Sequence, residues 1–423
     1  MTIPKDYFDW AAKLFDPSRI HEKPEALAGI RVLDLSVIYF GPATGDFLGE
    51  MGAEVIKVEM PGQGDVTRIL GNASFFWKNI SVAFFCANHS KYHMGIDMHR
   101  PEGQALIRQL AARSDIVIEN YKAGTLVRYG LGYADIRAIH PGIIYCSVTG
   151  FGQDGPYASR PGYDFIFQGM GGLMSITGER DGQPGGGPQK VGIAITDVLT
   201  GMYASLAITA AITARQTSGA GQYIDMALLD TIVAFGANQI LNYWCSGDVP
   251  QRFGNAHANI LPYEVFPTRD GHIILAVGND GQYAAFCRVA GRPELADDPR
   301  FRTNPDRVKH RPMLVPIVRE IMRTRTKQQW IDALEAAGVP CGPINNYAEV
   351  FDNPQVRHRG LRVDILGPLG TVPTVASPMR FSATPVQYDL PPPRLGEHTR
   401  EVLNGILDLS DAEIKRLGAQ GVV

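Results

Sequence analysis

The sequence predicts an α/β fold in which helices cover both faces of a doubly wound parallel sheet. Short runs rich in β-branched residues, at 30–36, 53–59, 115–120 and 143–150, alternate with amphipathic stretches. The runs are almost continuously apolar, as is typical of strands buried on both faces. A chain of 423 residues is also too long for one small core, so we expect two or three domains.

Helix signals separate the predicted strands. Residues 101–113 open with Pro-Glu and place apolar residues at helical spacing, which predicts a helix. A longer helix is expected from Asp197 to about Thr217, ending at the Gly219-Ala220-Gly221 break. An aspartate that heads an apolar helix is usually its N-cap, and this is the structural interpretation of Asp197.

The pattern changes near Gln251. Residues 263–268, the turn Arg269-Asp270-Gly271 and residues 272–277 predict a β-hairpin, because Asp-Gly supplies the positive φ of a tight turn. A terminal helix is expected near Ser410. The predicted organisation is an N-terminal arm at 1–28, a large domain at 29–225, a linker helix at 226–254, a small α+β domain at 255–345, and a C-terminal return at 346–423 that completes the large domain.

Composition argues against several classes of protein. A net charge of -3 provides no basic excess for a nucleic-acid partner. The five cysteines are scattered without a C-x-x-C pair, which favours a reducing cytoplasm. Residues 1–14 do not resemble a signal peptide, and the apolar stretch 201–214 is too short to span a bilayer, so no membrane association is expected.

Common cofactor motifs are absent from the sequence. Gly41, Gly45 and Gly49 follow the first strand in place of G-x-G-x-x-G, which predicts close helix-to-strand packing or, as the alternative, room for a ligand backbone. The chain contains no G-x-x-x-x-G-K-[ST], G-x-S-x-G or H-E-x-x-H motif. We therefore expect neither a metal nor a nucleotide cofactor.

A set of phrases is more specific than any single motif. In their order and spacing they resemble the class III CoA-transferase (CaiB/BaiF) family, from about Ala28 to the C terminus. The phrases are GAEVIKVE at 52–59, DIVIEN at 115–120, GFGQDGP at 150–156, RPGYD at 160–164, SITG at 175–178, GAGQ at 219–222, GNAH at 254–257 and LGEH at 395–398.

The resemblance implies a Rossmann-like large domain, a smaller inserted domain and an interlocked dimer. The dimer is expected to be a homodimer, or a heterodimer with a related subunit. The family's nucleophilic aspartate matches Asp197. In the mechanism that this implies, coenzyme A moves from an acyl-CoA to a carboxylic acid through an aspartyl anhydride and then an aspartyl thioester. One thioester replaces another, so no ATP is required.

Coenzyme A contacts carry over to particular positions of this chain. Several family members have an arginine for the adenosine phosphate where this chain has Met60-Pro61, and Lys91 or Arg68 is expected to substitute. Asp164 is also expected to support the site by accepting hydrogen bonds from nearby backbone N–H groups. The expected contacts are Tyr39, Phe40, Ile96, Asp97, Met98, His99, Asn120, Tyr121, Lys122, Arg128, Tyr163 and Asp164.

The substrates are less constrained by the sequence. Succinyl-CoA is the expected donor by family habit. Tyr39 stands where formyl-CoA transferase has glutamine, which argues against formyl-CoA and oxalate as the substrates. The aromatic residues at 75–77 and 84–85 indicate either packing or a bulkier acid.

Two other functions remain open. The same fold resembles α-methylacyl-CoA racemases, whose Gly-His-Asp segment is Gly162-Tyr163-Asp164 here. A phenol is a poor replacement for imidazole at neutral pH. The other alternative is one subunit of a hetero-oligomeric CoA-transferase, in which an inactive chain pairs with an active homologue; the presence of Asp197 argues against inactivity.

Overall fold

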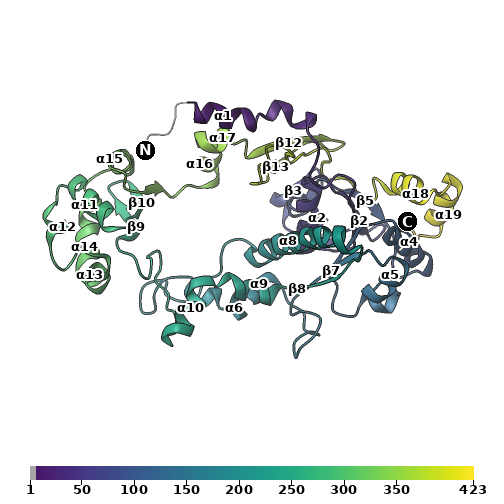
Figure 1. The fold of residues 1–423 in the computed structure, drawn as a ribbon, viewed down its shortest axis with the longest axis horizontal. Helices are drawn as coiled ribbons and strands as arrows, with labels where there is room; N and C mark the ends of the chain where they lie inside the picture. Colours follow the sequence, from purple (N-terminus) through teal and green to yellow (C-terminus); the bar gives the residue numbers. More distant parts are fainter. Residues whose placement is uncertain (1–5) are drawn as a thin grey trace. The chain divides into compact units, whose positions relative to one another are not determined.

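Two compact units make up the chain in the computed structural model, which describes residues 6–423 (Figure 1). Unit 1 contains residues 6–172, 192–238 and 357–423, and unit 2 contains residues 173–191 and 239–356. Both ends of the described chain therefore belong to unit 1. The predicted boundaries differ from these in three respects: segment 173–191 of the predicted large domain belongs to unit 2, the predicted linker 226–254 is divided after residue 238, and residues 346–356 of the predicted C-terminal return belong to unit 2.

The parallel sheet that the sequence predicts forms the centre of unit 1, and it has six strands, two more than the four runs predicted from the sequence. Its spatial order is β5-β2-β1-β6-β7-β8. When the six strands are numbered along the chain, this order is 3-2-1-4-5-6, which is the strand order of the Rossmann fold. Successive strands are added on one side of β1 and then, from β6 onward, on its other side. The strands are β1 (Arg31–Asp34), β2 (Glu54–Glu59), β5 (Tyr92–Gly95), β6 (Ile116–Glu119), β7 (Ile144–Thr149) and β8 (Tyr223–Ala227).

Helices cover both faces of this sheet (Figure 1). On one face, α2 (Phe40–Glu50) packs against α8 (Ile195–Ser218). On the other face, α4 (Pro101–Ala112), α5 (Tyr133–Ile139) and the C-terminal helix α18 (Thr399–Leu407) enclose the main apolar core. Helix α18, from the C-terminal segment 357–423, thus completes the helix layer that contains α4 and α5 from residues 6–172. This is the C-terminal return that the sequence predicts.

The remaining elements of unit 1 are short. The arm packs on the C-terminal segment, because Lys23 Nζ donates to the Ser382 carbonyl oxygen at 2.8 Å. Residues 1–5 of the predicted arm lie outside the described residues. These elements are α1 (Tyr7–Leu14), β3 (Phe76–Trp77), β4 (Ile80–Ser81), α3 (Val82–Phe85), α6 (Asp164–Met170), α9 (Leu228–Phe235), β12 (Arg362–Gly367), β13 (Gly370–Val375) and α19 (Asp411–Ala419), with α17 (Pro354–His358) at the boundary.

Unit 2 is a small α+β body with its own core. The predicted hairpin is confirmed, and a third strand joins it in the order β11-β10-β9. Phe286 and Trp330 are fully buried in the core. Its elements are α7 (Leu173–Ile176), β9 (Tyr263–Thr268), β10 (Gly271–Ala276), α11 (Asp280–Val289), α12 (Glu294–Asp297), α13 (Asn304–Lys309), α14 (Arg311–Met322), α15 (Lys327–Ala336), β11 (Cys341–Pro343) and α16 (Tyr347–Asp352).

The linker helix predicted at 226–254 is wrong in detail. Two helices occupy this segment, α9 and α10 (Ala237–Ser246), and the chain turns between them at Gly236. Ala237 has a φ of 42°, which an α-helix does not accommodate. An apolar pattern that runs through this break led to the prediction of a single helix.

Helix α8 is longer than its apolar stretch indicated. It has 24 residues and is apolar enough, by length and composition, to cross a membrane. Half of its most apolar window is buried inside the protein, and it packs against α2. One face of α8, which includes Ala204, Ile208 and Ala211, is buried in unit 1, and a core helix of this kind meets the same criteria.

The glycines of α2 allow it to pack tightly on the sheet. A Cβ atom at Gly45 would lie 2.9 Å from Asp34 Oδ2 and 3.0 Å from Lys91 Nζ. A Cβ at Gly49 would lie 2.5 Å from the Ser90 carbonyl oxygen. Of the two interpretations of this glycine pattern, the structure shows close packing.

We predict that Gly45→Ala destabilises unit 1. Alanine normally favours a helix interior, but here its methyl group would contact a fully buried ion pair, so the free energy of unfolding should fall by about 1–3 kcal/mol. Gly405→Ala in α18 is the matched control, because its Cβ meets nothing within 4 Å and should add about 0.5–1 kcal/mol. Urea titration measures both, and equal gains in stability would contradict the packing argument.

Candidate active site

Asp197 lies in the first turn of α8, with its side chain almost buried. The helix begins at Ile195, so Asp197 is its third residue, and the expected N-cap role is wrong. The residue is 8% exposed, and Asp197 Oδ1 has no hydrogen-bond partner among residues 6–423. A buried carboxylate oxygen without a partner is costly in a native structure, which makes Asp197 a candidate for a chemical role.

The N-cap of α8 comes from a different helix. Ala194, at the N-cap position, has no side chain able to accept a hydrogen bond. Asp164 Oδ1, at the start of α6, instead accepts from the Thr196 N–H at 2.7 Å and the Asp197 N–H at 3.4 Å. Gln168 Nε2 donates to Asp164 Oδ2 at 2.7 Å and fixes the carboxylate. Asp164 therefore accepts from backbone N–H groups, as expected, and Asp197 remains uncommitted.

The electrostatics of the site bring Asp197 close to its ionisation point at neutral pH. Burial, and then the negative charge of Asp164, raise the pKa of Asp197 to about 7. Burial is the larger cause because a carboxylate loses water on entering an apolar site. Asp197 is therefore partly ionised near pH 7, which is what a carboxylate nucleophile requires.

The start of α2 lies one helical turn from Asp197. A Cβ atom placed at Gly201 would lie 3.1 Å from the Phe40 carbonyl oxygen, so the two helices almost touch there. Burial, then Cys86 and Asp197, raise the pKa of Tyr39 to about 12, which keeps its hydroxyl protonated. Among the described residues, nothing accepts a hydrogen bond from the N–H groups of Phe40 and Gly41. Two predicted contacts, Tyr39 and Phe40, thus lie close to Asp197 and to the first turns of α8.

A pocket of about 220 Å³ lies at the carboxyl ends of β1, β2, β5 and β6. This is the edge of a doubly wound sheet at which ligands bind. The pocket brings together four of the predicted coenzyme contacts, Ile96, Met98, His99 and Tyr121. The other lining residues are Val37, Val58, Glu59, Met60, Gly64, Asp65, Thr125 and Tyr129.

Asn120 has a structural role next to this pocket. Its Oδ1 accepts from the Val37 N–H at 2.8 Å, and its Nδ2 donates to the Val37 carbonyl oxygen at 2.7 Å. Both ends of the amide are therefore used to hold the loop between β1 and α2. Asn120 joins β1 to β6 at the point where the strand order reverses.

The other predicted contacts, Asp97, Lys122, Arg128 and Tyr163, do not line this pocket. Asp97 accepts from the His99 N–H at 3.0 Å and so shapes the turn after β5. Lys122 and Arg128 are exposed, on the two sides of the lining residue Thr125 in the chain. Tyr163 is 65% exposed and does not line the described pockets.

Neither proposed substitute for the missing arginine is free to contact a phosphate. Lys91 is fully buried and its Nζ contacts Asp34 Oδ2 at 3.2 Å and the Ala87 carbonyl oxygen at 3.0 Å. Arg68 makes two bonds of 2.7 Å to the Glu59 carboxylate. Both cations are neutralised internally, and this expectation is corrected.

Sequence reasoning missed several residues of the pocket. Glu59, Asp65 and Tyr129 line it, and none of them was predicted as a contact. Glu59 ends β2, and Asp65 follows it closely, so their position relative to the strand ends was the available signal. The aromatic residues Phe84 and Phe85 belong to a small apolar core with Val372, which favours packing over acid binding.

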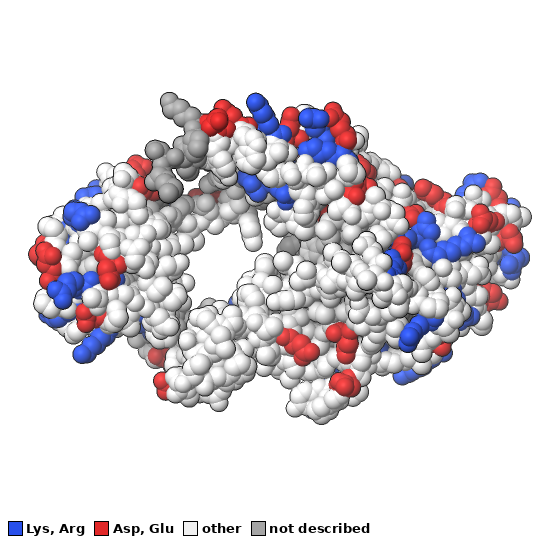
Figure 2. Space-filling model, in the orientation of Figure 1, with Lys and Arg blue, Asp and Glu red and all other residues white. Residues whose placement is uncertain are grey.

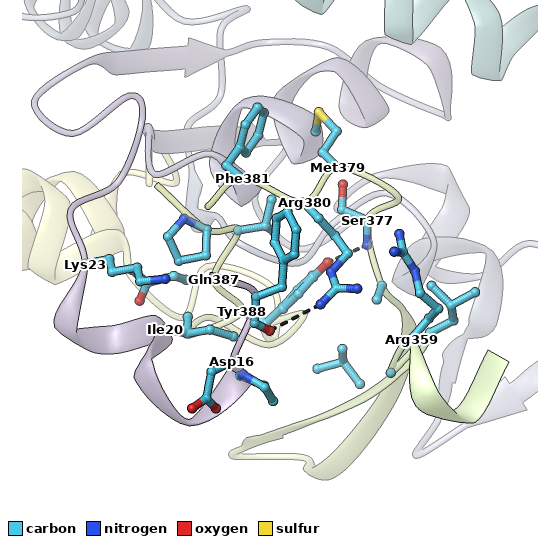
Figure 3. Close-up of a pocket in the computed structure, with 18 of the residues that line it drawn as sticks. Asp16, Ile20, Lys23, Arg359, Ser377, Met379, Arg380, Phe381, Gln387 and Tyr388 are labelled. Atoms are coloured by element: carbon cyan, nitrogen blue, oxygen red, sulfur yellow. Dashed lines mark hydrogen bonds between the residues drawn. The ribbon is translucent and has the colours of Figure 1, made fainter. Parts of the chain in front are cut away.

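A second pocket in unit 1, of about 400 Å³, lies between the arm and the C-terminal segment (Figure 3). Arg380 points into it, and its guanidinium donates to the Phe15 carbonyl oxygen at 3.2 Å. Tyr388 lies across the pocket and accepts a hydrogen bond from the Ser377 N–H. None of the predicted site residues lines this pocket.

The geometry can be compared with known proteins. The model of CoA-transferase family III matches residues 27–399. The chain belongs to this family. The CoA-transferase is 50% identical over 386 residues to succinate–glutarate CoA-transferase of Agrobacterium fabrum, covering 89% of this chain and 94% of the relative. It is 40% identical to human succinyl-CoA:glutarate CoA-transferase over 398 residues, covering 94% and 90%.

Solved structures agree with this assignment. A CAIB/BAIF family protein from Brucella suis superimposes with a TM-score of 0.81 at 43% identity, covering 91% of this chain and all of that one. A mutant of Rv3272 from Mycobacterium tuberculosis gives 0.79 at 27% identity, covering 92% and 100%. The family resemblance drawn from the sequence is therefore confirmed, and the protein is a transferase that uses CoA thioesters.

We predict that Asp164→Asn moves the pH dependence of this CoA-transferase. Asp197, whose pKa is raised to about 7, becomes ionised as pH rises through that value. If the ionised carboxylate is the form that reacts, kcat/KM of the wild type should rise through about pH 7. Removing the neighbouring negative charge should lower the midpoint by roughly half a unit to one unit.

The control is Asp154→Asn, an exposed aspartate of the loop after β7, which should leave the profile unchanged. Initial rates from pH 5 to 9 provide the comparison. A midpoint that stays in place in Asp164→Asn would show that Asp164 does not act on Asp197 through its charge.

Proposed function

We propose that this CoA-transferase moves coenzyme A from succinyl-CoA to a dicarboxylic acid such as glutarate, through a thioester on Asp197. The observation that carries the proposal is the state of Asp197: almost buried, with an unpartnered oxygen and a pKa of about 7, at the start of a helix. The printed activities of the relatives from Agrobacterium fabrum and humans supply the substrate class.

The chemistry needs only the carboxylate and the substrates. An Asp197 oxygen attacks the thioester carbonyl carbon, a C–O bond forms, and the C–S bond breaks to give a mixed anhydride and the CoA thiolate. The thiolate then attacks the Asp197 carbonyl carbon, which releases succinate and leaves CoA on the enzyme. The acceptor carboxylate next attacks this aspartyl thioester, and the liberated thiolate attacks the acceptor's acyl carbon, which restores the Asp197 carboxylate.

The first turn of α2 is the proposed stabiliser of the negative oxygen in these steps. The N–H groups of Phe40 and Gly41 have no acceptor among residues 6–423 and lie at the positive end of a helix. Donors that are fixed before the reaction stabilise an oxyanion without reorganisation. The Asp197 N–H contributes less, because it already faces the Asp164 carboxylate.

Coenzyme A is proposed to enter at the carboxyl edge of the sheet. Apolar walls from Val37, Met60 and Ile96, with Tyr121 and Tyr129, suit the flat adenine ring in the 220 Å³ pocket. The exposed cations Lys122 and Arg128 follow β6 and are proposed to contact the phosphates. The Glu59 carboxylate does not repel them strongly, since Arg68 neutralises it.

The racemase alternative has less support. Tyr163 stands where that chemistry needs an imidazole, and it is 65% exposed. Its neighbour Asp164 is engaged in capping α8 and bonding Gln168. Incorporation of solvent deuterium at the α-carbon of an acyl-CoA, without exchange of CoA between acids, would favour the racemase.

We propose that the enzyme acts as a homodimer. Apolar side chains that are exposed on α6 and α8 support an interface there, among them Phe165, Met202 and Leu206. Figure 2 shows few charged side chains over α8, whereas acidic and basic residues are mixed around α18 and α19. The five unpaired cysteines support a reducing, cytoplasmic location.

We predict that Asp197→Asn abolishes transfer of CoA from succinyl-CoA to labelled glutarate, with a loss of at least about a thousandfold, because an amide cannot form the anhydride. In the wild type, hydroxylamine added during turnover should mark the Asp197 peptide in mass spectra. Asp230→Asn is the matched control, since Asp230 is the third residue of α9, as Asp197 is of α8. Normal transfer by Asp197→Asn would refute the proposed mechanism.

We also predict that Asp197→Asn stabilises unit 1 above neutral pH. The pKa of Asp197 is about 7 in the folded protein, above its ordinary value of 3.8, so between these pH values the folded state binds a proton that the unfolded state does not, and wild-type stability falls as pH rises. Asparagine does not ionise, so the variant does not lose stability in this way as pH rises. Its free energy of unfolding should exceed that of the wild type by about 1–3 kcal/mol at pH 8 but by little at pH 4. Urea titrations at both pH values test this, and an equal gain at both would contradict it.

A further inference from the structure

The loop between β1 and α2 has an unusual backbone. Ile38 has a φ of 72°, in the left-handed region that β-branched residues avoid. A conformation of this kind persists only where the surroundings impose it, and it is concentrated at functional sites. Tyr39 and Phe40 follow directly, so the geometry at Ile38 sets the direction in which α2 starts.

Side chains from three other segments hold this loop in place. Asp65 accepts from the Ile38 N–H at 3.0 Å through Oδ2 and at 3.3 Å through Oδ1. Lys57 Nζ donates to the Ser36 carbonyl oxygen at 2.7 Å and pairs with Asp65 Oδ2 at 3.1 Å. Asn120 grips both backbone groups of Val37. Three consecutive residues are therefore fixed by side-chain bonds.

The Lys57–Asp65 pair is buried more completely than stability alone favours. Both side chains are fully buried, and an ion pair of this kind is often no more stabilising than apolar residues of similar volume. Its partners are also informative, since both members of the pair bond the backbone of the strained loop. The pair thus serves the geometry of this loop directly.

We propose that Asp65, held by Lys57, is a positioning residue that keeps Ile38 in its left-handed conformation and so directs the Phe40 and Gly41 N–H groups toward the carbonyl group reacting at Asp197. This inference rests on the proposed function. It adds a residue that does not touch the reacting atoms but controls the rate at which they react.

The test is the rate at which succinyl-CoA acylates Asp197 in a single turnover, measured by acid quench and mass spectrometry. Asp65→Asn retains the shape of the side chain but loses the charge that Lys57 and the Ile38 N–H require. We expect kcat and the acylation rate to fall about 10- to 100-fold, while KM for succinyl-CoA changes less than about threefold. Ile38→Gly, which relieves the left-handed strain, should lower kcat in the same way without lowering the urea midpoint.

Thr67→Val is the matched control. Thr67 Oγ1 donates to Asp65 Oδ1 at 2.7 Å, so this variant disturbs the same carboxylate without touching the loop, and kcat should stay within about twofold. Full acylation rates in both Asp65→Asn and Ile38→Gly would overturn the positioning role while leaving the proposed function intact. Absence of any Asp197 adduct in the wild type would instead reject the proposed function itself.

Discussion

The close packing of α2 against α8 is the constraint on which the site depends. Gly45 lets α2 lie on the Asp34–Lys91 pair, and Gly201 lets α8 approach the Phe40 carbonyl oxygen. Because of this contact, two helices begin side by side at one edge of the sheet. Their first turns carry partial positive charge, which favours a carboxylate between them. This partial positive charge favours the ionised form of Asp197, whereas burial favours the protonated form and raises its pKa.

Beneath α2, the protein buries several charged groups, and these compensate one another. Lys57 and Lys91 are each paired with an aspartate. Asp46 is different, because burial raises its pKa to about 7, and burial lowers the pKa of nearby His89 to about 4. His89 is therefore neutral at neutral pH, which reduces the charge that the interior must accommodate. Such a region is expensive to fold, and it holds the loop that leads to the site.

Much of this arrangement could be predicted from the sequence. Runs such as 53–59 specify buried strands because apolar periodicity reports burial directly. The family phrases located Asp197 and the turn after β5. Capping was not predictable, since Asp164 and Thr196 are 32 residues apart and only tertiary structure brings them together. The internal ion pairs of Lys91 and Arg68 were missed for the same reason, because the sequence shows a charged residue but not its partner.

The break inside 226–254 has another cause. Gly236 interrupts an apolar pattern that continues on both sides of it, and a single glycine is a weak signal against a long helix. The boundaries between the units were also missed, because the glycine- and proline-rich run 182–188 within segment 173–191 indicates a loop and does not show that the segment belongs to unit 2.

Because residues 173–191 leave unit 1 and the chain then returns to it, the hydrogen bond from the Thr196 N–H to Asp164 has a second role. Asp164 and Thr196 lie on the two sides of the excursion, and their hydrogen bond fastens its base, together with the bond of 3.3 Å from Gln168 Nε2 to the Ile193 carbonyl oxygen. A loop with an anchored base can vary in length and sequence at little energetic cost. Changes of length or sequence within 173–191 therefore need not displace the first turn of α8, which the Asp164 carboxylate holds.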